Sequence, residues 1–207
     1  MRIGIDFDNT IICYNGLFAQ AARERGWLGG EAQSWRKHAV RSAVRAMPDG
    51  ELCWQQLQAD VYAHRIAQAT VMPGVMTFLQ RAAEQGHDLW IVSHKSRFAK
   101  RDPAKLDLRE AALNWLQSQG LFAPQQTGLS PGQVYFESTR AEKLQRITQL
   151  KLDCFIDDLE EVLGDPAFPT GVEAILFAPE GRKSNGPYTL MTHWQQISQL
   201  LLAPERD

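Results

Sequence analysis

Residues 3–10 read Ile3-Gly4-Ile5-Asp6-Phe7-Asp8-Asn9-Thr10, so that a short apolar run passes directly into two acidic residues. The apolar run is typical of a fully buried β-strand, and the two aspartates stand where that strand would end. Side chains two residues apart on a strand point to the same face, so the Asp6 and Asp8 carboxylates should lie together. Neighbouring carboxylates repel each other, and a divalent cation such as Mg²⁺, which prefers oxygen ligands, would offset that repulsion.

Further apolar runs along the chain read as buried strands, and amphipathic helices separate most of them. The strands are expected at residues 3–7, 89–92, 134–136, 154–156 and 174–177, and the helices at residues 75–82, 108–116, 144–150 and 192–202. Thr139 and Glu142 form a capping-box pattern before the third of these helices. The alternation predicts an α/β fold, a Rossmann-like parallel sheet flanked by helices, with functional groups at the carboxyl ends of its strands.

The segment between the first strand and the helix at Val75 breaks this alternation. It carries three helical stripes of apolar residues, which begin near Leu17, Trp35 and Leu52. Turn residues separate the stripes, at Gly29-Gly30 and at Pro48-Asp49-Gly50. We therefore expect residues 1–14 and 71–207 to form a core domain, and residues 15–70 to form an inserted, all-helical cap.

Composition excludes several classes of protein. The chain has 207 residues, of which 44% are hydrophobic, and 22 Lys and Arg against 24 Asp and Glu give a formal charge of -2. This balance provides no global attraction to nucleic acid or to an anionic membrane. The three cysteines are too few for a disulfide framework, and no apolar run is long enough for a signal peptide or a membrane span. We expect a cytoplasmic protein; the oligomeric state has no signature in the sequence.

Other charged and polar residues stand at the expected ends of strands or starts of helices. Asp157 and Asp158 follow the predicted strand at 154–156, and Ser93 with His94 follows the strand at 89–92. Lys143 lies in the first turn of a helix, where its ammonium adds to the positive end of the helix dipole. Together these groups could hold a metal ion and a phosphate.

In this order, the motifs resemble those of the haloacid dehalogenase (HAD) superfamily. The matching features are D-x-D-x-T from Asp6 to Thr10, an apolar run ending in Ser93, then Lys143, then an apolar run ending in Asp157-Asp158, over residues 3 to about 163. The resemblance implies a Rossmann-like core with a C1-type helical cap inserted between the first two motifs. It also implies a Mg²⁺-dependent phosphatase that hydrolyses a small phosphorylated metabolite, a phosphomonoester, through an aspartyl-phosphate intermediate.

The resemblance also assigns roles. Asp6 would be the nucleophile and Asp8 the general acid and base. The phosphate would be bound by Thr10, Ser93, His94 and Lys143. Mg²⁺ would be held by Asp6, the backbone carbonyl of Asp8, Asp158 and, directly or through water, Asp157. Many members place a further carboxylate four residues after the metal-binding aspartate. Here Val162 stands four residues after Asp158, whereas Glu161 stands four residues after Asp157 and could take that supporting role.

Several alternatives stay open. Arg140 could replace Lys143 as the cation at the phosphate, and the basic run from His94 to Arg101 could be a solvated loop or could bind a second anionic group of the substrate. The same carboxylates could serve a phosphomutase or another HAD hydrolase. A catalytically idle binding protein of the same fold is the alternative outside enzymes.

Overall fold

The computed structural model describes residues 1–29, 35–181 and 184–202. The chain divides into two compact units, which we describe separately. The first unit comprises Met1–Ile12, Val71–Lys95 and Leu116–Asp207, and the second comprises Cys13–Thr70 and Ser96–Trp115. This division differs from the expected domain boundaries at residues 13–14 and 96–115, which group with residues 15–70.

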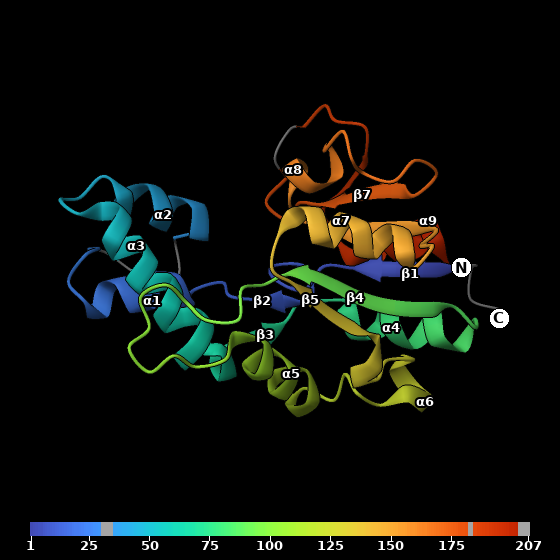
Figure 1. The fold of residues 1–207 in the computed structure, drawn as a ribbon, viewed down its shortest axis with the longest axis horizontal. Coiled ribbons are helices and arrows are strands. Elements are labelled where there is room, and N and C mark those ends of the chain that lie inside the picture. Colours follow the sequence, from blue (N-terminus) through green and yellow to red (C-terminus); the bar gives the residue numbers. More distant parts are fainter. Residues whose placement is uncertain (30–34, 182–183, 203–207) are drawn as a thin grey trace. The chain divides into compact units, whose positions relative to one another are not determined.

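The first unit is built on a six-stranded sheet whose neighbouring strands are all parallel (Figure 1). In spatial order the strands are β5 (Val134–Glu137), β4 (Asp88–His94), β1 (Arg2–Ile5), β6 (Cys154–Asp157), β7 (Glu173–Phe177) and β8 (Thr189–Met191). Because β1 lies between β4 and β6, the carboxyl ends of these three strands are neighbours. A separate two-stranded sheet pairs β2 (Ile12–Cys13) with β3 (Thr70–Val71).

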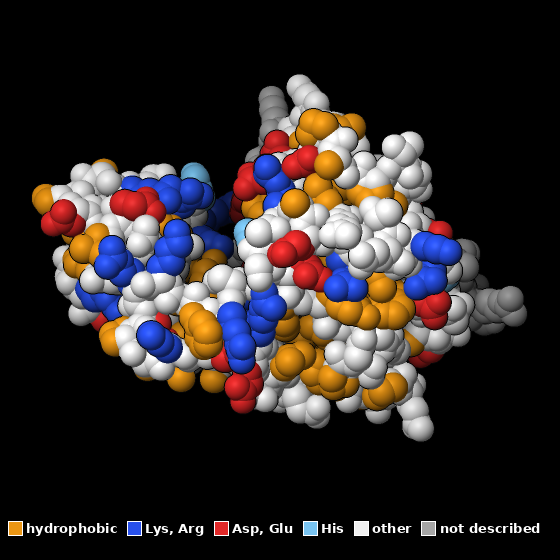
Figure 2. All heavy atoms as spheres, viewed as in Figure 1, with side chains coloured by type: hydrophobic (Ala, Val, Ile, Leu, Met, Phe, Trp, Pro, Cys, Tyr) orange, Lys and Arg blue, Asp and Glu red, His pale blue; other side chains and the backbone are white. Residues whose placement is uncertain are grey.

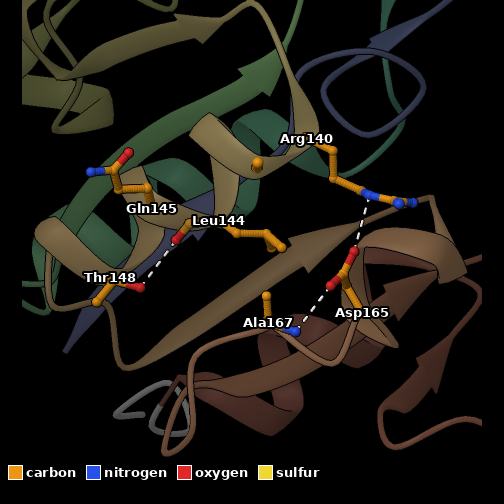
Figure 3. Close-up of a pocket in the computed structure, with 7 residues that line it drawn as sticks. Arg140, Leu144, Gln145, Thr148, Asp165 and Ala167 are labelled. Atoms are coloured by element: carbon orange, nitrogen blue, oxygen red, sulfur yellow. Dashed lines mark hydrogen bonds and ion pairs between the residues drawn. The ribbon is translucent and has the colours of Figure 1, made fainter.

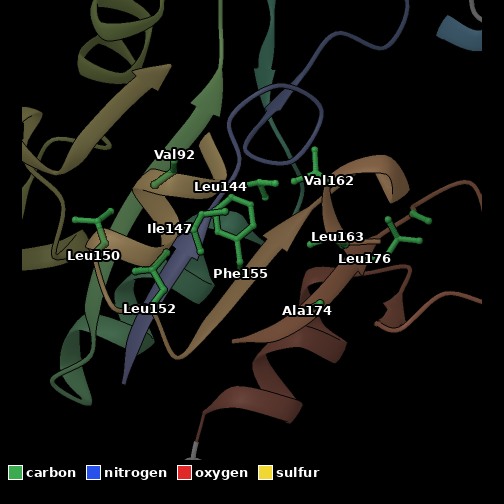
Figure 4. Close-up of a cluster of buried hydrophobic side chains, with 11 residues drawn as sticks. Val92, Leu144, Ile147, Leu150, Leu152, Phe155, Val162, Leu163, Ala174 and Leu176 are labelled. Carbon is green, nitrogen blue, oxygen red and sulfur yellow. The ribbon is translucent and has the colours of Figure 1, made fainter. Parts of the chain in front are cut away.

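Helices cover both faces of the six-stranded sheet. The helices of this unit are α4 (Val75–Glu84), α6 (Pro124–Thr127), α7 (Arg140–Gln149), α8 (Glu160–Leu163) and α9 (Trp194–Leu201), with a 3-10 turn at Pro131–Gln133. On one face, Leu144 and Ile147 of α7 and Leu163 of α8 pack in one cluster with Phe155 and Leu176 of the sheet (Figure 4). Trp194 of α9 packs on Phe78 and on Phe177, the neighbour of Leu176, and therefore belongs to the opposite face.

The capping box predicted before α7 is present. The Glu142 N–H donates to Thr139 Oγ1 at 3.1 Å, and the Thr139 N–H donates to Glu142 Oε2 at 2.9 Å. This arrangement fixes the first residue of α7. It thereby also fixes where the side chain of Lys143, three residues after Arg140, projects from the helix.

The second unit is mainly helical. Its elements are α1 (Leu17–Glu24), α2 (Lys37–Arg45), α3 (Gly50–Ala59), a π-helical turn (Asp60–His64), a 3-10 turn (Ile66–Gln68) and the first residues of α5 (Leu108–Ser118). Aromatic rings form part of its core: Phe18 stacks on Trp54 with centroids 5.2 Å apart, and Tyr62 lies 5.1 Å from Tyr14. Trp115 donates a hydrogen bond to the Ala69 carbonyl at 3.1 Å.

The structure confirms the predicted fold class and corrects some details of the elements. The short edge strand β8 was not predicted, and the third apolar stripe continues from α3 into a π-helical turn. Leu52, assigned to that stripe, is 37% exposed. Gly30 of the predicted Gly29-Gly30 break lies outside the described residues. Among the helices of residues 1–29, 35–181 and 184–202, none is long and apolar enough to cross a membrane.

Candidate active site

Asp6, Phe7 and Asp8 follow the last residue of β1, Ile5. Phe7 is fully buried and packs edge-to-face on Phe136, with ring centroids 5.9 Å apart, while Asp6 and Asp8 flank it. The Asp6 N–H still donates to the Ile156 carbonyl of β6 at 2.8 Å, so the sheet holds the Asp6 backbone. Asn9 then adopts a left-handed conformation with φ of 60°, which asparagine tolerates better than most residues, and the chain turns.

Three carboxylates meet at this edge. One oxygen atom from each of Asp6, Asp157 and Asp158 lies within 4.8 Å of the others. Asp6 and Asp157 are buried, whereas Asp158 is partly exposed and accepts a hydrogen bond from Asn9 Nδ2 at 3.1 Å. The cluster arises because β1 and β6 are neighbours that end at the same level, with Ile5 beside Ile156.

Lys143 compensates the charge of two of these carboxylates. Its side chain is 1% exposed, and Nζ lies 2.6 Å from Asp6 Oδ1 and 2.6 Å from Asp157 Oδ2. The ammonium also lies 5.2 Å from the centroid of the Phe155 ring. Removing an ion pair of this kind from water is costly unless both charges are closely paired, as they are here.

Burial and charge shift the pKa values of both partners. Burial raises the pKa of Asp6 to about 6; Lys143 opposes this shift, and the charges of Asp157 and Asp8 add to it. Burial acts to lower the pKa of Lys143, but Asp157 and Asp6 outweigh it and hold that pKa above its ordinary value. The Lys143 ammonium thus favours the ionised form of Asp6, against the effect of burial on that carboxyl.

A second buried lysine pairs with Asp8. Lys95 Nζ lies 3.0 Å from Asp8 Oδ1 and 2.9 Å from Asp8 Oδ2, and the Lys95 side chain is 3% exposed. In the sequence, Lys95 belongs to a basic run that could be a solvated loop, and for this reason its contact with Asp8 was not predicted. The available signal was the spacing from Ser93: residues two apart on a continuing strand share a face, and here Ser93 and Lys95 are buried while His94 between them is exposed.

The remaining predicted phosphate-binding residues differ in their positions. Ser93 is 1% exposed at the end of β4, next to the carboxyl end of β1. Thr10 is fully buried, and its hydroxyl has no hydrogen-bond partner within the described part of the chain. The His94 side chain is exposed and its Nε2 contacts the Ser138 carbonyl at 2.9 Å. The structure therefore does not bring the His94 ring to the carboxylates.

The alternative cation and the further carboxylate lie elsewhere. Arg140 pairs with Asp165 at 3.0 Å, and these two residues line a pocket of about 460 Å³ against α7 (Figure 3). None of the three clustered aspartates lines that pocket. Glu161 is exposed on α8, and its backbone carbonyl accepts from Arg140 at 3.2 Å. Lys143, rather than Arg140, is the cation beside Asp6.

The donor set fits a magnesium ion. Mg²⁺ is bound through one or two carboxylates together with water and substrate phosphate. Asp6 and Asp158 supply such carboxylate oxygens. Asp157 already accepts from Lys143 through Oδ2 and from the Leu159 N–H, at 3.0 Å, through Oδ1. Three neighbouring acidic groups, of which Lys143 contacts two, leave negative charge that a divalent cation would offset.

Comparisons with solved structures identify the fold. No family model and no curated protein sequence matches the chain. A HAD family hydrolase from Deinococcus radiodurans with bound phosphate and sodium matches with a TM-score of 0.58 and 16% identity, over 99% of this chain and 98% of that chain. A dehalogenase with an intermediate complex matches with a TM-score of 0.61 and 13% identity, over 98% of this chain and 97% of that chain. The hydrolase YfnB from Bacillus subtilis bound to magnesium matches with a TM-score of 0.59 and 14% identity, over 97% of each chain.

These similarities extend over nearly the whole chain at low sequence identity. They bear on the fold alone, which in this chain is the six-stranded parallel sheet flanked by helices. The chain has the fold of the haloacid dehalogenase superfamily hydrolases.

Proposed function

We propose that this protein is a Mg²⁺-dependent phosphatase that hydrolyses a small phosphorylated metabolite through an aspartyl-phosphate on Asp6. The observation that supports this most strongly is the contact of the buried Lys143 with both Asp6 and Asp157, beside Asp158, at the carboxyl edge of the sheet. A buried cation among three carboxylates is costly to maintain for stability alone. Anionic phosphate chemistry gives such a cluster a use.

In the first step, an Asp6 carboxylate oxygen attacks the phosphorus atom and the bond from phosphorus to the leaving oxygen breaks. Asp8, protonated at this stage, gives its proton to that oxygen, so the product leaves as an alcohol. Lys143 holds the Asp6 carboxylate in place and offsets the charge of the phosphoryl oxygens. Ser93, buried at the end of β4, donates its hydroxyl hydrogen to one of those oxygens.

In the second step, the ionised Asp8 accepts a proton from water, and the water oxygen attacks phosphorus. Inorganic phosphate is released, the Asp6 carboxylate is regenerated, and Asp8 is again protonated. Asp6, the Asp8 backbone carbonyl and Asp158 would hold Mg²⁺ directly, with Asp157 acting through water because its oxygens already have partners. When bound, Mg²⁺ would neutralise charge on the phosphate and orient it.

We propose that residues 15–70 act as a cap over the reaction. Helical insertions of this kind admit substrate and then exclude bulk water. The second unit contains these residues together with residues 96–115, so we assign substrate selection to side chains of this unit. A cap of this size would favour a small organic phosphate over a phosphoprotein as the substrate.

The proposal is tested by measuring inorganic phosphate released from 4-nitrophenyl phosphate, with Mg²⁺ and with EDTA. Asp6→Asn should lose at least about 10³-fold in turnover, because it removes the nucleophile. Asp165→Asn, which removes a carboxylate outside the cluster, is the matched control and should keep its activity. Unchanged turnover in Asp6→Asn would exclude Asp6 as the nucleophile. Absence of phosphate release from a broad panel of phosphate esters would favour an idle binding protein.

A further inference from the structure

Lys95 continues the pattern of β4 beyond its last residue. Its N–H donates to the Glu137 carbonyl of β5 at 2.9 Å, so the sheet hydrogen bonding holds its backbone. Its side chain therefore leaves the strand on the same face as Ser93, two residues earlier. The backbone of Lys95 is thus held at the carboxyl edge of the six-stranded sheet, and Lys95 is not a mobile loop residue.

The ammonium of Lys95 makes a two-point contact with Asp8. The distances to Asp8 Oδ1 and Oδ2 differ by only 0.1 Å, at 3.0 and 2.9 Å, and the ammonium lies 5.2 Å from the centroid of the Phe7 ring. A contact with both oxygens restricts rotation of the carboxylate about its last bond. The Asp8 side chain is 21% exposed, so it remains accessible from the edge of the sheet.

Each of the two proposed catalytic carboxylates thus has its own buried lysine. Lys143 reaches Asp6 from α7, and Lys95 reaches Asp8 from the end of β4. Two separate lysines suit two carboxylates with different tasks. The Asp6 carboxylate must point at the phosphorus atom, whereas the Asp8 carboxylate must face first the leaving oxygen and then water.

We propose that Lys95 is a positioning residue that holds the Asp8 carboxylate where it can exchange a proton with the leaving group. This inference rests on the phosphatase function proposed above. It assigns Lys95 to the proton-transfer half of the reaction. A lysine that bound the substrate phosphate would instead help every phosphate ester to a similar degree.

Phosphate esters with different leaving groups distinguish positioning of Asp8 by Lys95 from binding of the substrate phosphate by Lys95. 4-Nitrophenolate leaves as a stable anion and needs little help from an acid, whereas an alkoxide must be protonated as it leaves. We would measure formation of the aspartyl-phosphate in single-turnover experiments with 4-nitrophenyl phosphate and with ethyl phosphate. Single turnover isolates the first step from hydrolysis of the intermediate, in which Asp8 acts as a base with both substrates.

Lys95→Met should lose about 10²-fold in this rate with ethyl phosphate and less than about 10-fold with 4-nitrophenyl phosphate. KM for both substrates should change little. Lys95→Arg should recover most of the loss, because a guanidinium also contacts both oxygens of a carboxylate. Lys100→Met, an exposed lysine of the same basic run, is the matched control and should behave as the parent.

Equal losses with both esters and a raised KM would overturn the proposal in favour of phosphate binding. A loss of rate that is the same for both leaving groups and is accompanied by a lowered melting temperature would overturn it in favour of a structural role. Failure of the phosphatase function is recognised separately, since the parent would then release no phosphate from either ester. Failure of Asp6 as the nucleophile is recognised because Asp6→Asn would keep the activity of the parent. If Asp6 is required and Lys95→Met matches Lys100→Met, the inference on Lys95 alone is wrong.

Discussion

The carboxyl edge of the sheet and the surface of the second unit both contain many charged residues, but they hold them differently. At the sheet edge, Lys143 and Lys95 are almost fully buried and contact carboxylates. In the second unit, the pair Arg45–Glu51 is 37% and 58% exposed, and pairs such as Arg65–Glu24 are also open to solvent on at least one side. On the face shown in Figure 2, side chains of both signs lie next to one another at many points of the surface.

This difference predicts where the loss of a charged partner should matter most. A solvated pair costs little and contributes little, because water already stabilises each ion. A buried pair loses that hydration. Removing one partner then lowers the free energy of unfolding strongly, because the other charge stays buried without compensation. The same type of substitution should therefore have very different consequences in the two regions.

The largest effect should come from Lys143→Met, which leaves Asp6 and Asp157 buried without their cation. We expect the free energy of unfolding to fall by about 3–5 kcal/mol, and phosphatase activity to be lost. Urea denaturation in EDTA measures the first effect. Lys151→Met, an exposed lysine just after α7, is the control and should stay within about 0.5 kcal/mol of the parent.

The pH dependence of this variant follows from Asp6. Its pKa is already raised to about 6 by burial, and losing Lys143 should raise it further. The folded state then binds a proton that the unfolded chain releases, so stability should rise as the pH falls from about 7 to about 5. A Lys143→Met protein as stable as the parent at neutral pH would contradict the described pairing.

A smaller effect should come from adding Mg²⁺ to the parent. An ion that binds only the folded state stabilises it by about 2.7 kcal/mol at 100 times its dissociation constant, which corresponds to a rise of several degrees in melting temperature. Asp158→Asn should lose most of this rise, while Asp165→Asn should keep it. The absence of any rise in the parent would argue against the three aspartates as a magnesium site.

Much of the sheet edge could be predicted because its signals are local. An apolar run followed by a polar residue marks the end of a buried strand at Asp6, Ser93 and Asp157, and the Thr139 capping box fixes the start of the helix that carries Lys143. Parallel strands then bring these ends together by topology alone.

Other features could not be predicted because they depend on contacts distant in sequence. The grouping of residues 96–115 with the second unit involves contacts such as that of His64 with Asp102 at 3.0 Å, which no local pattern indicates. The strand β8 has only three residues, none of them fully buried, so it lacks an apolar signature. The burial of Lys95 depends on how far the pattern of β4 continues. The basic run from His94 to Arg101 gives no local signal for this, because it reads as a solvated loop.

The smallest effect should come from Arg45→Gln in the second unit. Arg45 Nε lies 2.7 Å from Glu51 Oε2, a good ion-pair distance, yet both side chains are well exposed. We expect the melting temperature to change by no more than about 2 °C, and that change to shrink further at high salt because the pair is screened. Calorimetry of Arg45→Gln, Glu51→Gln and the double variant measures the coupling of the pair. A loss as large as that of Lys143→Met would show that burial is not what separates the two regions.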